Sequence, residues 1–252
     1  MSEPRTIQLR YQVQSRDDWA LSEEPMPESQ PHDLTVELIR ALLSHWIARN
    51  ARNAQVARNL AVRWDEQHPR VGVDPDVCLI VPATPEGPAL ESLATWRPGH
   101  TPPRVAFEVV SSSPQKDYIS APERYAASGT VELVVFDSML RGPRAHGGPH
   151  RIQVWRRAAD GTFERVAAGE GPFFLESLDA WAFATDEGQR LRFADDREGT
   201  LWWSTAEEAE RAEKVRERAE KVRALADNER ERAEKEAALA RVAALEAELA
   251  RR

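Results

Sequence analysis

Residues 104–117, RVAFEVVSSSPQKD, contain the pattern that decides the fold. The first seven residues, RVAFEVV, form a largely apolar run that is followed by three serines, which predicts a buried β-strand. Successive side chains of a strand point to opposite faces, so Glu108 shares a face with Ala106 and Val110. A carboxylate therefore lies in the middle of a strand that is otherwise apolar, and Lys116 follows it closely.

The placement of Glu108 needs a physical reason. Burying an isolated carboxylate costs several kcal/mol or raises its pKa sharply. A strand glutamate usually pairs with an arginine or faces solvent, and a site for a cation is the alternative. Lys116 is the only lysine before residue 200, since the other three lie in the charged C-terminal region, and it is either a solvated loop residue or a partner of Glu108.

The rest of the chain up to about residue 203 alternates between helix-like and strand-like patterns. A stripe of apolar residues with a period of 3.6 predicts a helix after Pro31, and Gly129 is expected to end a second helix. The regions 16–31 and 82–103 are rich in proline and are expected to be loops. The expected elements are helices over 33–50 and about 117–127, and strands over 7–13, 54–65, 76–82, 104–111, 131–137, 152–157, 162–167 and 190–195. This order predicts an α/β domain with a central mixed sheet.

Composition divides the chain into two expected domains, 1–203 and 205–252. The whole chain has 42 acidic and 34 basic residues, and 13 and 12 of these lie in the second part, which leaves 29 and 22 in the first. An acidic first domain argues against a protein that coats nucleic acids. Cys78 is the only cysteine, so no internal disulfide forms. We find no signal sequence and no apolar run long enough for a membrane, and we expect a cytoplasmic protein.

The second part is almost entirely Ala, Glu, Arg, Lys, Leu and Val, without glycine or proline. It predicts a long helix in which Ala212, Val215, Ala219, Val222 and Ala226 follow the 3-4 spacing of a coiled coil. Either a single solvated helix or a coiled coil with a second copy or another partner fits this pattern. Trp202 or Trp203 is expected to fix the start of the helix on the first domain.

A second carboxylate lies at the start of a neighbouring strand. Asp76 follows Pro75 and precedes VCLIV. Taken alone, an Asp after Pro is ordinary turn chemistry. Two carboxylates from neighbouring strands are, however, suitable ligands for Mg²⁺, which binds oxygen and keeps several waters. The six histidines show no spacing typical of metal ligands, and His32 and His45 are expected to be cap and surface residues.

The stretches DPDVCLIV, PPRVAFEVVSSSPQKD, ERYAASG and VELVVFD, in this order, resemble the Uma-two family of restriction-endonuclease-like proteins. That family belongs to the PD-(D/E)xK nuclease superfamily. The resemblance covers about residues 25–140 and implies a restriction-endonuclease-like fold. Members often carry an Ala/Glu/Arg-rich helical tail like this one.

The resemblance implies that Asp76 and Glu108 are ligands for Mg²⁺ or Mn²⁺ in a DNA endonuclease. The usual lysine is missing, because Val110 and Ala121 occupy the two positions where the family places it. Lys116 is then the candidate for the catalytic cation.

A further acid before or in the first helix is expected to join the site, with Glu28 as the first choice and Glu24 and Glu37 after it. The competing hypothesis is a nuclease-like domain that has lost activity and acts in binding or assembly through its helical tail. A homodimer, through the sheet domain or the C-terminal helix, is also expected.

Overall fold

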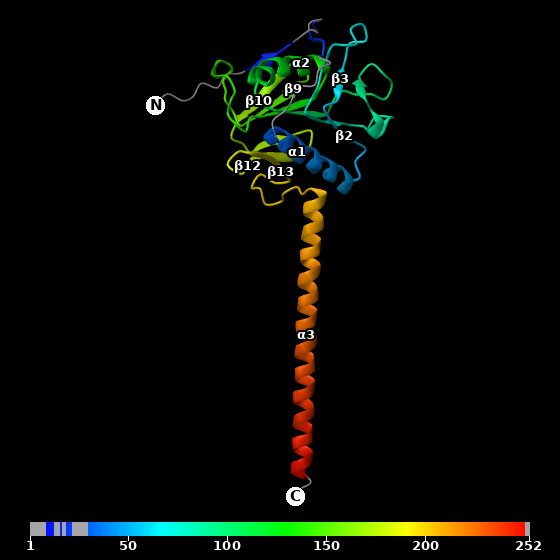
Figure 1. Cartoon of the computed structure of the whole chain (residues 1–252), viewed down its shortest axis with the longest axis vertical. Coiled ribbons are helices and arrows are strands. Elements are labelled where there is room, and N and C mark those ends of the chain that lie inside the picture. Colours follow the sequence, from blue (N-terminus) through cyan, green and yellow to red (C-terminus); the bar gives the residue numbers. More distant parts are fainter. Residues whose placement is uncertain (1–8, 13–15, 17–18, 22–29, 250–252) are drawn as a thin grey trace, which may run out of the picture. The chain divides into compact units, whose positions relative to one another are not determined.

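The computed structural model describes residues 9–12, 16, 19–21 and 30–249. The chain divides into two compact units, Met1–Thr205 and Ala206–Arg252. The first unit is a mixed α/β domain and the second is a single long helix (Figure 1). The predicted fold class, a central mixed sheet followed by a C-terminal helix, is therefore confirmed. Within the described ranges, no helix is long and apolar enough to cross a membrane.

A seven-stranded sheet forms the centre of the first unit, in the order β1-β10-β9-β8-β7-β5-β2. β7 and β8 are parallel, whereas the other neighbours in this sheet are antiparallel. The strands are β1 (Arg10–Tyr11), β2 (Gln55–Arg58), β5 (Val77–Ile80), β7 (Val105–Val109), β8 (Glu132–Phe136), β9 (Ile152–Arg157) and β10 (Phe163–Gly169). The strand predicted over 104–111 is thus β7, and it lies inside the sheet between β8 and β5.

Two smaller sheets flank the central one. One has the order β4-β3-β6 and the other β11-β12-β13. Their strands are β3 (Ala61–Arg63), β4 (Gly72–Val73), β6 (Ser92–Ala94), β11 (Phe173–Leu175), β12 (Ala180–Thr185) and β13 (Arg190–Ala194). The prediction that 82–103 is wholly irregular is wrong, because it contains β6 and the short 3₁₀ helix Gly87–Ala89. A second 3₁₀ helix spans Arg144–His146.

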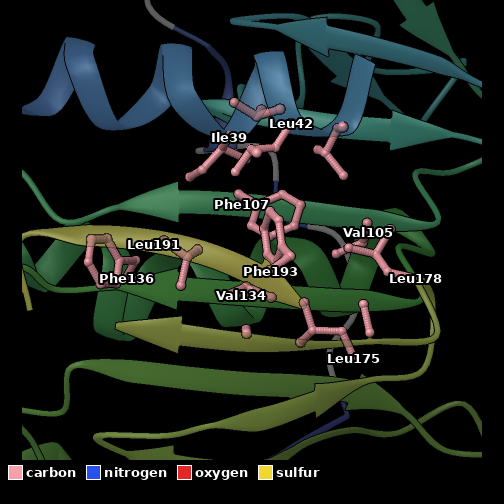
Figure 2. Close-up of a cluster of buried hydrophobic side chains, with 14 of the residues drawn as sticks. Ile39, Leu42, Val105, Phe107, Val134, Phe136, Leu175, Leu178, Leu191 and Phe193 are labelled. Atoms are coloured by element: carbon pink, nitrogen blue, oxygen red, sulfur yellow. The ribbon is translucent and has the colours of Figure 1, made fainter. Parts of the chain in front are cut away.

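Two helices cover opposite faces of the central sheet. α1 (Gln30–Arg49) packs with Val105, Phe107 and Val109, whereas α2 (Ala121–Ser128) packs on the face that contains Ala106 and Val110. On the α1 face, residues of β11, β12 and β13 join the same apolar core (Figure 2). The alternation predicted for β7 is therefore confirmed, and it assigns Glu108 to the α2 face.

The predicted strand over 54–65 is in fact two strands in different sheets. β2 pairs with β5, and β3 pairs with β4 and β6. Asn59 lies between them with φ +49°, a left-handed conformation that asparagine tolerates better than most residues. Its backbone N–H donates to the carbonyl of Pro75 at 3.1 Å, so the bend also holds the segment that leads into Asp76.

Substitution of Asn59 tests this bend. We expect Asn59→Val to lower the free energy of unfolding by about 1–3 kcal/mol, because a β-branched residue is strained at positive φ. Asn59→Gly, the matched control, should change it by only a few tenths of a kcal/mol. Urea denaturation of the two variants measures the difference, and equal stability of both would show that the bend relaxes freely.

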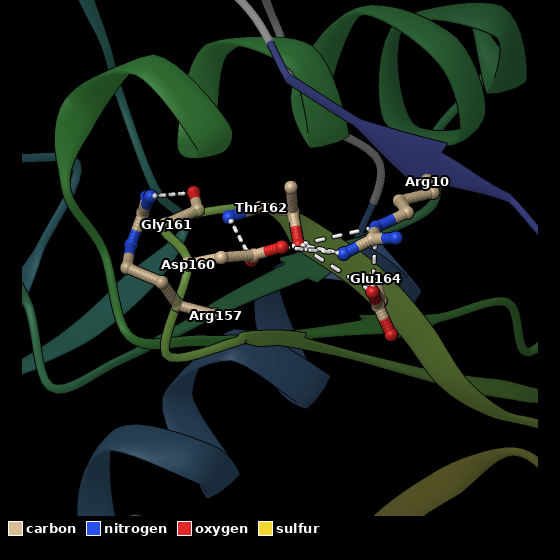
Figure 3. Close-up of polar contacts among 6 residues, drawn as sticks. All are labelled: Arg10, Arg157, Asp160, Gly161, Thr162 and Glu164. Atoms are coloured by element: carbon tan, nitrogen blue, oxygen red, sulfur yellow. Dashed lines mark hydrogen bonds and ion pairs between the residues drawn. The ribbon is translucent and has the colours of Figure 1, made fainter.

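The hairpin between β9 and β10 is fixed by side chains around its turn (Figure 3). Arg157 Nη1 donates to the Gly161 carbonyl at 2.9 Å, and the Thr162 N–H donates to Asp160 Oδ1 at 3.0 Å. Arg10 of β1 donates to Asp160 Oδ2 at 2.7 Å. These contacts hold the edge strand β1 against the hairpin, in which it pairs with β10.

The end of the first unit is fixed by one of the two tryptophans at 202 and 203. Trp203 is 1% exposed, and its ring stacks on Trp46 of α1 with centroids 5.1 Å apart. Trp202 is exposed and contacts Phe183. α3 (Ala206–Leu249) then runs for 44 residues without a break.

Candidate metal and nuclease site

The pairing of β5 with β7 brings the two predicted acids together. Val77 lies opposite Phe107 in this antiparallel pair. Continuing the register by one residue places Asp76 opposite Glu108. Directly opposite residues share one face of a sheet, with their Cβ atoms about 4.5–5.5 Å apart. Both carboxylates are buried, at 6% and 1% exposure.

Asp76 is held in place from two sides. Its Oδ2 accepts a hydrogen bond of 2.7 Å from the backbone N–H of Val109 in β7. The same oxygen lies 3.2 Å from Nε2 of His32, which is buried at the start of α1. The expectation that His32 is a cap or surface residue is therefore wrong, because the helix directs it inward to Asp76.

Glu108 has a neutral partner. The Tyr125 hydroxyl on α2 donates to its Oε1 at 2.6 Å, and both residues are buried. Burial raises the pKa of the Glu108 carboxyl well above its usual range, and the negative charge of Asp76 raises it further. Lys116 acts in the opposite direction and lowers this pKa. In the absence of a cation, Glu108 is thus costly to ionise.

A third acid enters from the start of the second helix. The helix predicted over about 117–127 begins with a π-helical turn, Lys116–Ser120, which continues into α2. Such turns are wider than α-helical ones and are frequent at functional sites. Here the turn buries Asp117, whose Oδ2 accepts from the Ser111 N–H at 3.4 Å. Burial, together with the charge of Asp76, raises the pKa of Asp117 to about 7.

Lys116 lies next to these acids. The charge of Glu108 is the largest cause that raises the pKa of the Lys116 ammonium, and Asp117 and Asp76 add to it. The side chain nevertheless remains exposed. An ammonium group that is exposed to solvent and electrostatically coupled to buried carboxylates is in a position to meet a ligand at the surface.

Further charges surround the same place. Asp74 is half-buried, and burial raises its pKa, whereas the nearby charges of Lys116, Arg63 and Arg124 lower it. Three cationic side chains, from β3, the π-turn and α2, thus lie close enough to influence this acidic centre.

Of the additional acids predicted upstream, the structure describes one. Glu28 and Glu24 lie outside the described residues. Glu37 is on the exposed side of α1, where it forms an ion pair of 2.6 Å with Arg40 that lowers the pKa of the carboxyl. Among the described residues, Asp117 and His32 approach the two carboxylates.

The arrangement suits a hard divalent cation. A cation beside Asp76 and Glu108 would remove the repulsion that raises the pKa of Glu108. Over the described part of the chain, no three His, Cys, Asp or Glu side chains are grouped so as to hold a metal ion by themselves. Asp76 and Glu108 supply carboxylate oxygens, the ligands that hard divalent cations prefer.

Sequence reasoning missed three of the contributing residues. Asp117 directly follows Lys116, so its proximity to the strand end was a usable signal. Tyr125 lies in ERYAASG, one of the stretches that carry the family resemblance, but nothing in the sequence indicated its bond to Glu108. His32 is 44 residues from Asp76, and no local pattern connects them.

Comparison with known proteins identifies the family of this chain. No curated protein matches the chain. A solved structure from Anabaena variabilis, described as "a putative nuclease belonging to DUF820", shares 14% sequence identity, covering 61% of this chain and 76% of that one with a TM-score of 0.41. Residues 10–185 match the model of Uma2, described as "Putative restriction endonuclease". This match spans well over half of the sequence, and the chain therefore belongs to the Uma2 family, as its resemblance predicted.

Proposed function

We propose that this protein is a metal-dependent nuclease that hydrolyses phosphodiester bonds in DNA. The observation that carries the proposal is the pair of buried carboxylates, Asp76 and Glu108, which the register of β5 and β7 brings opposite each other. Lys116 is close enough for their charges to raise the pKa of its ammonium. Families with a restriction-endonuclease-like fold generally use divalent metal ions, and membership of Uma2 supports such a role.

In this proposal, Asp76 and Glu108 hold Mg²⁺ or Mn²⁺. When bound, such an ion lowers the pKa of a coordinated water and stabilises negative charge on a phosphoryl oxygen. The Val109 N–H and the Tyr125 hydroxyl orient the two carboxylates through their hydrogen bonds. Preorganised ligands of this kind do not need to rearrange when the substrate arrives.

Lys116 has the role of the missing family lysine. Lys116 is exposed, and the charge of Glu108 raises the pKa of its ammonium, so this group can stabilise negative charge that develops on the phosphate. The π-turn places it at the first position of the segment that leads into α2. Val110 and Ala121 leave the two usual lysine positions without a cation.

Cleavage of plasmid and single-stranded DNA with Mg²⁺ or Mn²⁺ tests the proposal. The assay needs low salt, because the net charge of −8 predicts weak, salt-sensitive DNA binding. We expect Glu108→Ala to abolish cleavage and Lys116→Ala to reduce it by about 10²–10³-fold. Lys221→Ala on α3 is the matched control for the loss of one lysine charge and should cleave like the wild type.

The outcomes separate the parts of the proposal. Full activity of Glu108→Ala would exclude the site, whereas full activity of Lys116→Ala would exclude only the role of the lysine. No cleavage by the wild type, together with Mn²⁺ binding that needs Glu108, would support the competing function. In that case the domain binds metal without hydrolysis.

The competing function is a nuclease-like domain without activity that serves in binding or assembly. The observation in its favour is the pair of substitutions at the usual lysine positions, Val110 and Ala121. The acidic composition of the protein also disfavours tight binding to DNA. In this case α3 is the element that contacts a partner.

A further inference from the structure

α3 contains a seven-residue repeat that the proposed nuclease site does not explain. The sequence reads RAEKVRE at 211–217, RAEKVRA at 218–224 and RAEKEAA at 232–238. A repeat of seven is shorter than two turns of a straight α-helix, so equivalent positions follow a left-handed path around it. Two helices with such a repeat keep the same face in contact by supercoiling.

The repeat defines one stripe along the helix, which we call the heptad stripe. An alanine recurs at every seventh residue, and a second position lies three residues after each alanine. The stripe consists of Ala212, Val215, Ala219, Val222, Ala226, Glu229, Ala233, Glu236, Ala240, Ala243 and Ala247. Its two valines are 65% and 66% exposed, so large apolar groups on it face solvent when the helix is alone.

The charges beside the stripe differ between its two halves. In the first half, four of the five flanking positions are arginines, Arg211, Arg216, Arg218 and Arg223, and the fifth is Leu225. In the second half, Glu229 and Glu236 lie on the stripe itself and Glu246 beside it, with two flanking arginines. One half of this face is thus strongly basic, and the other has a small acidic excess.

This asymmetry decides the orientation of a pair formed with a second copy. A parallel pair would place Arg218 next to Arg223 of the second copy, and Glu236 against its own equivalent. Flanking charges set partner choice and orientation in coiled coils, and these contacts are repulsive. In an antiparallel pair with Ala219 opposite Glu236 of the second copy, this glutamate lies near Arg218 and Arg223, and Arg211 approaches Glu246. Arg223 also approaches Arg230, and Glu229 approaches its own equivalent, so the attractive contacts outnumber the repulsive ones.

We propose that α3 binds the α3 of a second copy of this chain in an antiparallel coiled coil. The same alignment places Val222 opposite Ala233 and Val215 opposite Ala240 of the second copy, so each exposed valine is covered by a small residue. Alanine buries little apolar area, so the charges contribute the orientation and the valines most of the apolar contact. The proposal does not depend on nuclease activity.

The oligomeric state of the full-length chain is the first measurement. Sedimentation velocity over a wide range of concentration is expected to show a reversible dimer. Glu229→Arg combined with Glu236→Arg should raise the dissociation constant at least about tenfold. Glu220→Arg combined with Asp227→Arg is the matched control, because these residues lie outside the stripe, and it should not. A monomer at every concentration, or equal effects of both pairs, would overturn the proposal.

Thiol cross-linking then reports the orientation. The natural Cys78 is buried, so a cysteine introduced on α3 supplies the reactive thiol. Ala219→Cys mixed with Glu236→Cys should give a cross-linked pair with a short bis-maleimide, because these positions meet in the antiparallel alignment. Ala219→Cys alone should give none, since residues 17 apart along a helix are separated by about 25 Å. Efficient cross-linking of Ala219→Cys with itself would show a parallel pair and refute the proposal.

Discussion

Replacing Glu108 with glutamine is expected to stabilise the protein at pH 8 while abolishing DNA cleavage. Glutamine keeps an oxygen that accepts from the Tyr125 hydroxyl, but it removes a negative charge that is buried beside Asp76. The expected gain in the free energy of unfolding is on the order of 2 kcal/mol, the scale of the penalty for desolvating one buried group. Residues kept for activity commonly reduce stability in this way.

The dependence of this gain on pH follows from the direction of the pKa shift. The pKa of Glu108 is raised in the folded protein, so the folded state binds the proton more tightly than the unfolded state. The contribution of Glu108 to stability is therefore most favourable below its unfolded pKa of about 4 and is lost as pH rises through the folded pKa. Asp117 has a folded pKa of about 7, which is also raised, so its contribution to stability is lost in the same way as pH rises.

Thermal unfolding of both proteins between pH 4 and pH 8 measures this effect. The advantage of Glu108→Gln should be present at pH 8 and disappear near pH 4, where Glu108 is protonated. Added Mg²⁺ should stabilise the wild type and leave the variant almost unchanged, because a ligand that binds only the folded state stabilises it by mass action. A variant that is less stable than the wild type at pH 8 would mean that Glu108 is a structural residue.

Replacing Glu132, another buried glutamate in a strand, should have the opposite effect on stability. Glu132 is 0% exposed in β8, but Arg156 donates to its Oε1 from Nη2 at 2.9 Å and from Nε at 3.1 Å. The backbone N–H groups of Glu176 and Ser177 also donate to the carboxylate, at 3.3 and 3.0 Å. It therefore joins β8 and β9 to the segment that follows β11.

We expect Glu132→Ala to lower the free energy of unfolding by about 2–4 kcal/mol, because Nε of Arg156 and the backbone N–H groups of Glu176 and Ser177 lose their acceptor. Arg156 keeps its ion pair of 2.6 Å with Glu176, so its charge is not left without a partner. Glu164→Ala is the matched control. Its carboxylate pairs with Arg10 near the surface, where such a pair contributes less than about 1 kcal/mol. Urea denaturation at neutral pH compares the three proteins. A cost for Glu132→Ala no greater than that for Glu164→Ala would show that the buried pair contributes nothing.

These two glutamates show where sequence reasoning reaches its limit. Each lies in a short strand rich in valine, and each local pattern is the same: a carboxylate among apolar residues. The sequence suggests two partners for a buried glutamate, an arginine or a bound cation, but it does not show which of them each glutamate has. Arg156 on β9 meets Glu132, and Asp76 before β5 meets Glu108, because of strand order and register.

The sequence by itself determined the properties that depend on neighbours along the chain. The alternation in RVAFEVV assigned Glu108 to one face of its strand, the apolar stripe after Pro31 predicted α1, and the composition after residue 205 predicted α3. Local geometry is enough for these, since a strand has a period of two and a helix a period of 3.6.

Only the tertiary structure decided which side chains meet at the site. His32, Asp76, Glu108 and Tyr125 come from four separate elements or their ends, and the contacts between them are fixed by how α1 and α2 pack on the sheet. The break of the predicted strand at Asn59 arises in the same way, because β2 and β3 are drawn into different sheets. Such contacts depend on the free energy of the whole core, to which residues far apart in the sequence contribute together, and no local pattern encodes that sum.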